Sequence, residues 1–177
     1  MPNYCEVAPG HPFHGPYHDL EYGFPVTDDN VLFERLVLEI NQAGLSWLTI
    51  LKKREGFFAA FEGFDVHRVA KYGEAERERL LSDASIIRNK LKVNAAIENA
   101  RTICELQKEF GSFSAWLEKH HPLEKGEWVK LFKKTFLFTG GEITGEFLMS
   151  TGYLPGAHEE DCPILKKIAR LKPPHMR

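Results

Sequence analysis

Residues 38–47, LEINQAGLSW, mark the end of one predicted helix and the start of the next. Gly44 suits the position just after a helix end, and Ser46 suits the cap of the following helix. At about 100° per residue, the apolar residues before the turn share one helical face, and they are Leu32, Phe33, Leu36, Ile40 and Ala43. We therefore expect an amphipathic helix, a tight turn and a second helix.

Glu39 lies at the edge of this apolar face, where a carboxylate is costly unless it has a partner or a chemical role. The turn places the Trp47 indole close to Glu39, and an acid beside a flat ring indicates a pocket for a planar, electron-poor heterocycle. A simpler interpretation stays open. Arg35, four residues earlier, could form a solvated salt bridge with Glu39, and Trp47 could be a core aromatic. This stretch alone favours the simpler interpretation.

The composition is that of a soluble globular protein and the length fits one domain, with 177 residues, 43% hydrophobic and 27% charged. No apolar run approaches the ~18–20 residues that span a bilayer. The N-terminal segment MPNYCEVAPG has neither the basic start nor the apolar core of a signal peptide. We therefore expect a cytoplasmic protein without a membrane association. A net charge of −2 argues against non-specific coating of nucleic acid but allows a local basic face.

The pattern along the chain predicts an all-α protein, because no stretch alternates as a strand does. We expect an irregular arm rich in proline and glycine over 1–26, a helical body over 27–152, and a C-terminal region over 153–177. The basic segment Lys166–Arg177 is interpreted as a solvated tail. Helices are expected over 28–43, 46–53, 66–72, 74–81, a long segment ending near 110, 113–119, 127–134, 142–150 and 164–171.

Two cysteine–histidine pairs indicate a metal site. Cys5 and His18 lie in the arm, and His158 and Cys162 lie near the C-terminus. Two thiolates and two imidazoles make a tetrahedral set typical of structural zinc, which would staple the arm to the C-terminal region. The alternative is that Cys5 is a small buried residue and the histidines are surface residues. The spacing does not decide between them, since the chain has eight histidines.

The segment 83–92 indicates a contact with DNA. A short helix, a hairpin that holds Ile86 and Ile87, and a long following helix are typical of a helix-hairpin-helix element. Its backbone amides and the next helix N-terminus face a phosphate. Arg88, Lys90 and Lys92 add positive charge there. The alternative is an ordinary solvated face.

Several short sequence motifs follow one another along the chain. Taken together, they resemble the 3-methyladenine DNA glycosylase I family over roughly residues 5–162. The words are YHD at 17–19, EYG at 21–23, LE at 38–39, QAGLSW at 42–47, LKKRE at 51–55, IIRN at 86–89 with Lys92, FLFTG at 136–140 and His158-x-x-x-Cys162.

The resemblance implies a single helix-hairpin-helix DNA glycosylase domain over 1–177, with the hairpin near 83–92. It implies a monomer that binds double-stranded DNA and flips an alkylated purine, most of all 3-methyladenine, out of the duplex. It also implies a structural zinc ion that clips the arm to the C-terminal region. The zinc ligands map onto Cys5, His18, His158 and Cys162.

The resemblance also assigns the site. The base-binding glutamate maps onto Glu39, the stacking tryptophan onto Trp47 and a pocket tyrosine onto Tyr17. N3-methylation makes adenine cationic and its glycosidic bond labile. The enzyme therefore needs only stacking, a carboxylate that accepts a charge-assisted hydrogen bond, and water. Tyr22 and His14 are expected as further substrate-binding residues. The expected DNA contacts are Ser85, Ile86, Arg88, Lys90 and Lys92.

This chain departs from the family pattern at four positions. Val7 and Tyr22 stand where tryptophans are usual, His14 replaces an aromatic residue, and Ser85 replaces the glycine before the two isoleucines. Val7 and His14 remove aromatic rings from the expected cage around the base. They therefore affect which lesion is recognised more than they affect the fold. Two alternatives follow: a catalytically altered homologue that binds damaged DNA, or a glycosylase for a bulkier lesion.

Overall fold

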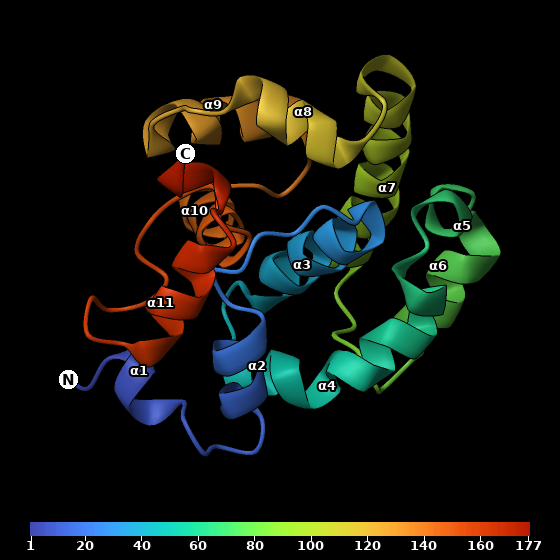
Figure 1. Ribbon diagram of the computed structural model, residues 1–177. Helices are drawn as coiled ribbons and strands as arrows, with labels where there is room; N and C mark the ends of the chain where they lie inside the picture. Colours follow the sequence, from blue (N-terminus) through green and yellow to red (C-terminus); the bar gives the residue numbers. More distant parts are fainter.

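The apolar face before residue 44 forms α3 (Asp29–Gln42), the helix at the centre of the fold (Figure 1). Asp28 caps α3, because its side chain accepts hydrogen bonds from the amides of Asn30 and Val31. Every residue of α3 from Leu32 to Asn41 is buried. The helix packs against α4, α7, α8 and α10 and so forms the middle of the main core.

The computed structural model describes all residues 1–177, which form helices and no strands. The all-α prediction is confirmed, and no helix combines the length and apolarity needed to cross a bilayer. In order, the helices are α1 (Tyr4–Val7), α2 (His14–Leu20), α3 (Asp29–Gln42), α4 (Trp47–Ala60), η1 (Glu62–Phe64), α5 (Val66–Ala70), α6 (Glu74–Leu81), α7 (Lys90–Phe110), α8 (Phe113–His120), α9 (Lys125–Thr135), α10 (Gly141–Ser150), α11 (Pro163–Arg170) and η2 (Pro174–Met176).

The arm over 1–26 differs from the irregular segment expected, because it contains the two short helices α1 and α2. A capping box starts α1: Asn3 accepts from the Glu6 amide at 3.0 Å, and Glu6 accepts from the Asn3 amide at 2.9 Å. Pro16 lies in the first turn of α2, where its missing N–H costs no helical hydrogen bond.

An ion-pair network fixes the arm on the body. Arg54 of α4 donates to both carboxylate oxygens of Glu21 at 2.7 Å, a bidentate pair. The same guanidinium donates to Glu34 of α3 at 2.9 Å. Buried Arg35 lies 3.5 Å from Glu21 on the other side. Three segments that are separate in the sequence are therefore held at one point.

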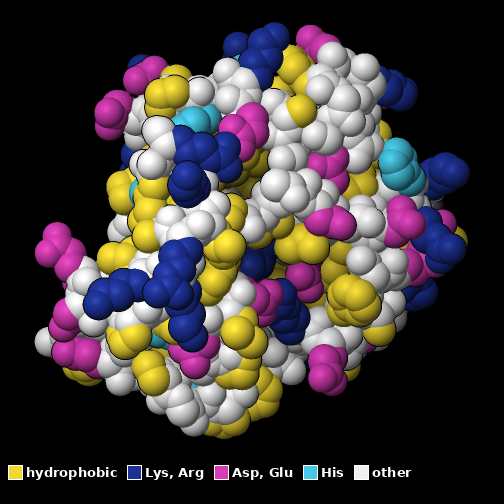
Figure 2. All heavy atoms as spheres, viewed as in Figure 1, with side chains coloured by type: hydrophobic (Ala, Val, Ile, Leu, Met, Phe, Trp, Pro, Cys, Tyr) yellow, Lys and Arg dark blue, Asp and Glu magenta, His cyan; other side chains and the backbone are white.

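The basic C-terminal segment is more than the solvated tail expected. Its first five residues belong to α11 (Pro163–Arg170), which buries Ile164 and Ile168 and exposes Lys166, Lys167 and Arg170. Figure 2 shows Lys and Arg side chains gathered over this part of the molecule. The helix thus packs through one face and presents a basic face to solvent.

The turn between α6 and α7 packs very closely on α4. A Cβ atom added to Gly56, in the interior of α4, would lie 2.5 Å from the Ser85 carbonyl oxygen. Glycine is required there by the close approach of two backbones.

We expect Gly56→Ala to destabilise the protein by about 1–3 kcal/mol, because the turn must move to admit the methyl group. The matched control is Gly126→Ala in α9, where an added Cβ meets nothing within 4 Å. That change should gain up to about 1 kcal/mol from helix propensity. Urea unfolding measures both. A Gly56→Ala variant as stable as the wild type would contradict the close packing.

Candidate active site

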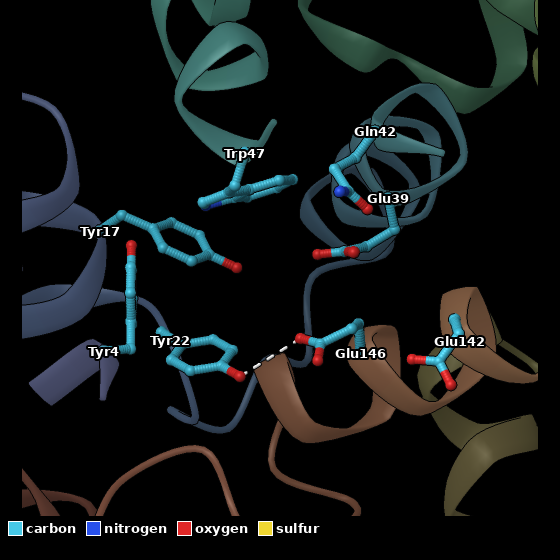
Figure 3. A pocket seen from close by; sticks show the side chains of 8 residues that line it. All are labelled: Tyr4, Tyr17, Tyr22, Glu39, Gln42, Trp47, Glu142 and Glu146. Carbon is cyan, nitrogen blue, oxygen red and sulfur yellow. Dashed lines mark hydrogen bonds between the residues drawn. The ribbon is translucent and has the colours of Figure 1, made fainter. Parts of the chain in front are cut away.

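A cavity of about 390 Å³ opens between the arm, α3, the start of α4, and α10 (Figure 3). Its size is within the range of small-molecule sites. The arm supplies tyrosines, α3 and α10 supply acidic side chains, and α4 supplies an indole. The lining residues are Tyr4, Tyr17, Tyr22, Glu39, Gln42, Trp47, Glu142 and Glu146.

Glu39 is buried in the cavity wall, with 5% of the residue exposed. The solvated Arg35–Glu39 salt bridge that the sequence left open does not form, because Arg35 is itself buried and pairs with Glu21. Burial, followed by the negative charge of Glu146, raises the pKa of Glu39 to about 8, and the charge of Arg35 offsets only part of this. A pKa of about 8 favours the protonated form of this carboxyl group at neutral pH.

Aromatic rings form the walls beside this carboxyl group. The Tyr17 ring lies 5.2 Å from the Trp47 ring and stacks on Tyr22 at 5.6 Å. The Tyr17 hydroxyl points into the cavity toward Glu39 (Figure 3). This hydroxyl and the Trp47 indole N–H are buried without a hydrogen-bond partner. The cavity thus offers flat faces, two free donors and one acid, which suits a planar heterocycle.

The first helix supplies a pocket residue that the sequence did not indicate. Tyr4 lines the cavity, and its hydroxyl bonds Nδ1 of His14 at 2.9 Å. His14 therefore lies behind Tyr4 and outside the lining, and Val7 is 48% exposed and also outside it. The expectation that His14 binds the substrate directly is therefore corrected, because Tyr4 and not His14 lines the cavity.

The sequence did not indicate three further residues that line the cavity, Gln42, Glu142 and Glu146. Gln42 follows Glu39 by three residues on α3, so helical spacing places both on one side. Glu142 and Glu146 are four residues apart on α10 and share a face in the same way. Their spacing is visible in the sequence, but nothing local shows that α10 faces α3.

The cysteine–histidine cluster expected from the sequence comes together behind the cavity. The ligand atoms of Cys5, His18, His158 and Cys162 all lie within 4.8 Å of one another. Cys162 Sγ is 3.5 Å from Nδ1 of His158 and 3.7 Å from Nε2 of His18. Bonds of about 2.3 Å to sulfur and about 2.0 Å to nitrogen give a tetrahedron with edges of about 3.5 Å. The donor set and spacing therefore fit a tetrahedral metal ion.

Outer hydrogen bonds orient both histidines. Nε2 of His158 donates to the Tyr22 carbonyl oxygen at 2.6 Å, and Nδ1 of His18 lies 2.7 Å from the Asp19 carboxylate. Such partners are typical of metal-binding histidines because they fix the tautomer. The first bond also ties the cluster to a residue of the cavity wall.

The residues expected to contact DNA separate into two groups. Arg88, Lys90 and Ser85 are exposed on the turn and the start of α7. The Ile86 side chain is buried in the core. Lys92 requires a correction, because its ammonium donates to the carbonyls of Asn41 and Ala43 at 2.8 and 2.7 Å. It closes the C-terminal end of α3 and is not directed at solvent.

The raised pKa of Glu39 predicts how stability varies with pH. The ordinary value is 4.5 and the folded value about 8. Between them the folded protein holds a proton that the unfolded chain has released, so the free energy of unfolding falls as pH rises. Glu39→Gln removes this slope. The variant should gain on the order of 1–3 kcal/mol over the wild type between about pH 5 and pH 8.

Urea unfolding across this pH range makes the comparison, with exposed Glu109→Gln in α7 as the control. The control should follow the wild-type curve. Parallel curves for the wild type and Glu39→Gln would mean that Glu39 is ionised in the folded protein.

Comparisons with known proteins agree with this geometry. The model of the methyladenine glycosylase family matches residues 8–135. DNA-3-methyladenine glycosylase 1 of Escherichia coli K12 is 48% identical over 103 residues, 58% of this chain and 55% of the relative. The match therefore spans about half the length of that relative. DNA-3-methyladenine glycosylase of Haemophilus influenzae is 34% identical over 166 residues, 83% of this chain and 89% of the relative.

Solved structures have the same fold. 3-Methyladenine DNA glycosylase I from Staphylococcus aureus superposes with a TM-score of 0.82 at 30% identity, over 92% of this chain and 96% of that chain. A variant of a 3-methyladenine DNA glycosylase I, solved in complex with 3-methyladenine, gives 0.81 at 30% identity over 92% and 97%. By sequence and by structure, the chain belongs to the methyladenine glycosylase family.

Proposed function

We propose that the protein is a DNA-3-methyladenine glycosylase I, a hydrolase that removes alkylated purines, above all 3-methyladenine, from double-stranded DNA in base-excision repair. One observation carries the proposal: a buried carboxyl group without a cationic partner, Glu39, faces two aromatic rings in a cavity of about 390 Å³. Family membership and the names of the relatives support it.

The chemistry needs little from the protein because the lesion is already activated. Methylation at N3 leaves a positive charge on adenine, and departure of the base neutralises that charge. The base must leave the duplex to reach the cavity. Trp47 and Tyr17 then supply aromatic contacts, and Glu39 accepts a charge-assisted hydrogen bond from the base.

The pKa of Glu39 gives this contact its selectivity. Glu39 holds a proton in the empty cavity, so a neutral base gains no ion pair there. A cationic base favours the ionised carboxylate and lowers its pKa. No aspartate directly follows Lys92, where other glycosylases carry one, and Val93 and Asn94 stand there instead. The protein therefore holds the leaving group and admits water.

The turn between α6 and α7 is proposed to act as a helix-hairpin-helix contact with a DNA phosphate. Ser85, Arg88 and Lys90 are exposed there, at the N-terminus of the longest helix of the protein. A helix N-terminus favours a bound anion through its free amides and its dipole. The other two residues named from the sequence, Ile86 and Lys92, would support this surface from inside.

We further propose that the cysteine–histidine cluster holds one structural zinc ion. Cys5, His18, His158 and Cys162 would bind it and so tie α1 and α2 to the loop before α11. His158 would link the bound ion to the cavity wall through its hydrogen bond to the Tyr22 carbonyl, so the ion would have a structural role. We expect a cytoplasmic monomer.

The substitution Glu39→Gln tests the reaction. We expect release of free 3-methyladenine from methylated duplex DNA to fall by about 10²-fold or more, as when one charge-stabilising group is lost from a site. Chromatography of the released bases measures it, and exposed Glu109→Gln serves as the control with unchanged release. Tight binding of lesion-containing DNA without release by the wild type would indicate a damage-binding protein. Faster release of larger adducts would indicate a different lesion.

Elemental analysis tests the metal. Protein purified without added metal should contain one zinc ion per chain, and Cys162→Ser should lose it together with thermal stability. Cys104→Ser is the matched control, because Cys104 lies on α7 outside the cluster. A folded wild-type protein that contains no metal would refute the zinc proposal.

A further inference from the structure

A second carboxylate faces the cavity, and the reaction described above does not use it. Glu146 of α10 points into the same space as Glu39 (Figure 3). The Tyr22 hydroxyl donates a hydrogen bond to it at 3.2 Å. Glu142, one turn earlier on α10, is exposed and lies farther out.

The charges around the cavity are one-sided. Three acids line it, Glu39, Glu142 and Glu146, and no lysine, arginine or histidine does. The cations that act on the two inner acids, Arg35 on Glu39 and Lys125 on Glu146, lie outside the lining. Burial raises the pKa of Glu146 as well, with the Tyr22 hydrogen bond opposing it. Two neighbouring carboxylates in a half-buried site resist joint ionisation. A positively charged occupant relieves this conflict, and a neutral one does not.

Tyr22 has a fixed backbone position beside the second carboxylate. Tyr22 is fixed at both backbone groups: its amide donates to the Tyr17 carbonyl at 2.8 Å, and its carbonyl accepts from His158 at 2.6 Å. The hydroxyl therefore has a fixed position from which it orients Glu146.

We propose that Glu146, positioned by Tyr22, is a specificity-determining residue that selects positively charged alkylated bases over neutral bases of similar shape. Glu39 and Glu146 then form a pair of carboxylates around one cationic ring. The inference rests on the proposed function, since it assigns the cavity to a base. It adds that charge is recognised at two carboxylates and not at one.

Calorimetric titration of the intact, metal-loaded protein with two free bases tests the proposal. The probes are 3,9-dimethyladeninium, a fixed cation, and 9-methyladenine, which is neutral. Glu146→Gln keeps the size and hydrogen-bonding ability of the side chain and removes only its charge. We expect it to weaken binding of the cation at least about tenfold and to leave the neutral base within about twofold.

Two further variants separate position from charge. Tyr22→Phe keeps the ring but releases Glu146, so the preference for the cation should fall partway toward that of Glu146→Gln. Glu127→Gln, on an exposed position of α9, should keep the wild-type preference. Equal thermal melting of the Glu146→Gln and wild-type proteins excludes a folding defect as the cause.

Equal losses for both probes, or none for either, in Glu146→Gln would overturn the inference, as would a wild type that does not bind the cation. The outcome is separate from that of the base-release assay. Release of 3-methyladenine with an unchanged cation preference in Glu146→Gln would keep the function and reject the role of Glu146. A Glu146-dependent preference without release would reject the function and support this role.

Discussion

A carboxyl group that is buried without a cationic partner, Glu39, constrains the whole pocket. Burial opposes its ionised form, and the neighbouring charge of Glu146 opposes it further. The group keeps its place because α3 is buried along most of its length and cannot rotate to expose it. The burial of Glu39 costs stability, and the packing of α3 in the core offsets this cost. The pocket thereby contains an acid that a positively charged ligand can ionise.

The opposite wall consists of short helices that could not stand alone. Helices of four and seven residues, α1 and α2, are far below the length at which isolated helices persist. The Glu21–Arg54 pair holds the arm on one side, and the cysteine–histidine cluster holds it on the other. Tyr4, Tyr17 and Tyr22 face the cavity because of these two attachments. The cluster therefore helps to position the tyrosines of the pocket, although it does not itself line the cavity.

The features that the sequence predicted correctly are those with local sequence signals. The helices α3, α6, α7 and α8 were expected close to their observed bounds, because apolar spacing and caps such as Ser112 lie within the segments. Glu39 and Trp47 were placed together for the same reason: one turn joins them.

The arm helices were not predicted, since their capping and attachments involve few residues and distant partners. Lys92 was misjudged because its partners, the carbonyls of Asn41 and Ala43, are about fifty residues away in the chain. Glu146 was missed because only tertiary packing brings α10 to the pocket.

Carbon-13 NMR of the Glu39 carboxyl group across the pH range tests this account most directly, with the Glu39→Gln spectrum identifying the signal. The account predicts a pKa of about 8 in the free protein. It also predicts a marked fall in this pKa when 3,9-dimethyladeninium is bound, because a cation favours the ionised form. A Glu39 signal that titrates near the ordinary value of 4.5 in the free protein, or one that the cation leaves unchanged, would contradict it.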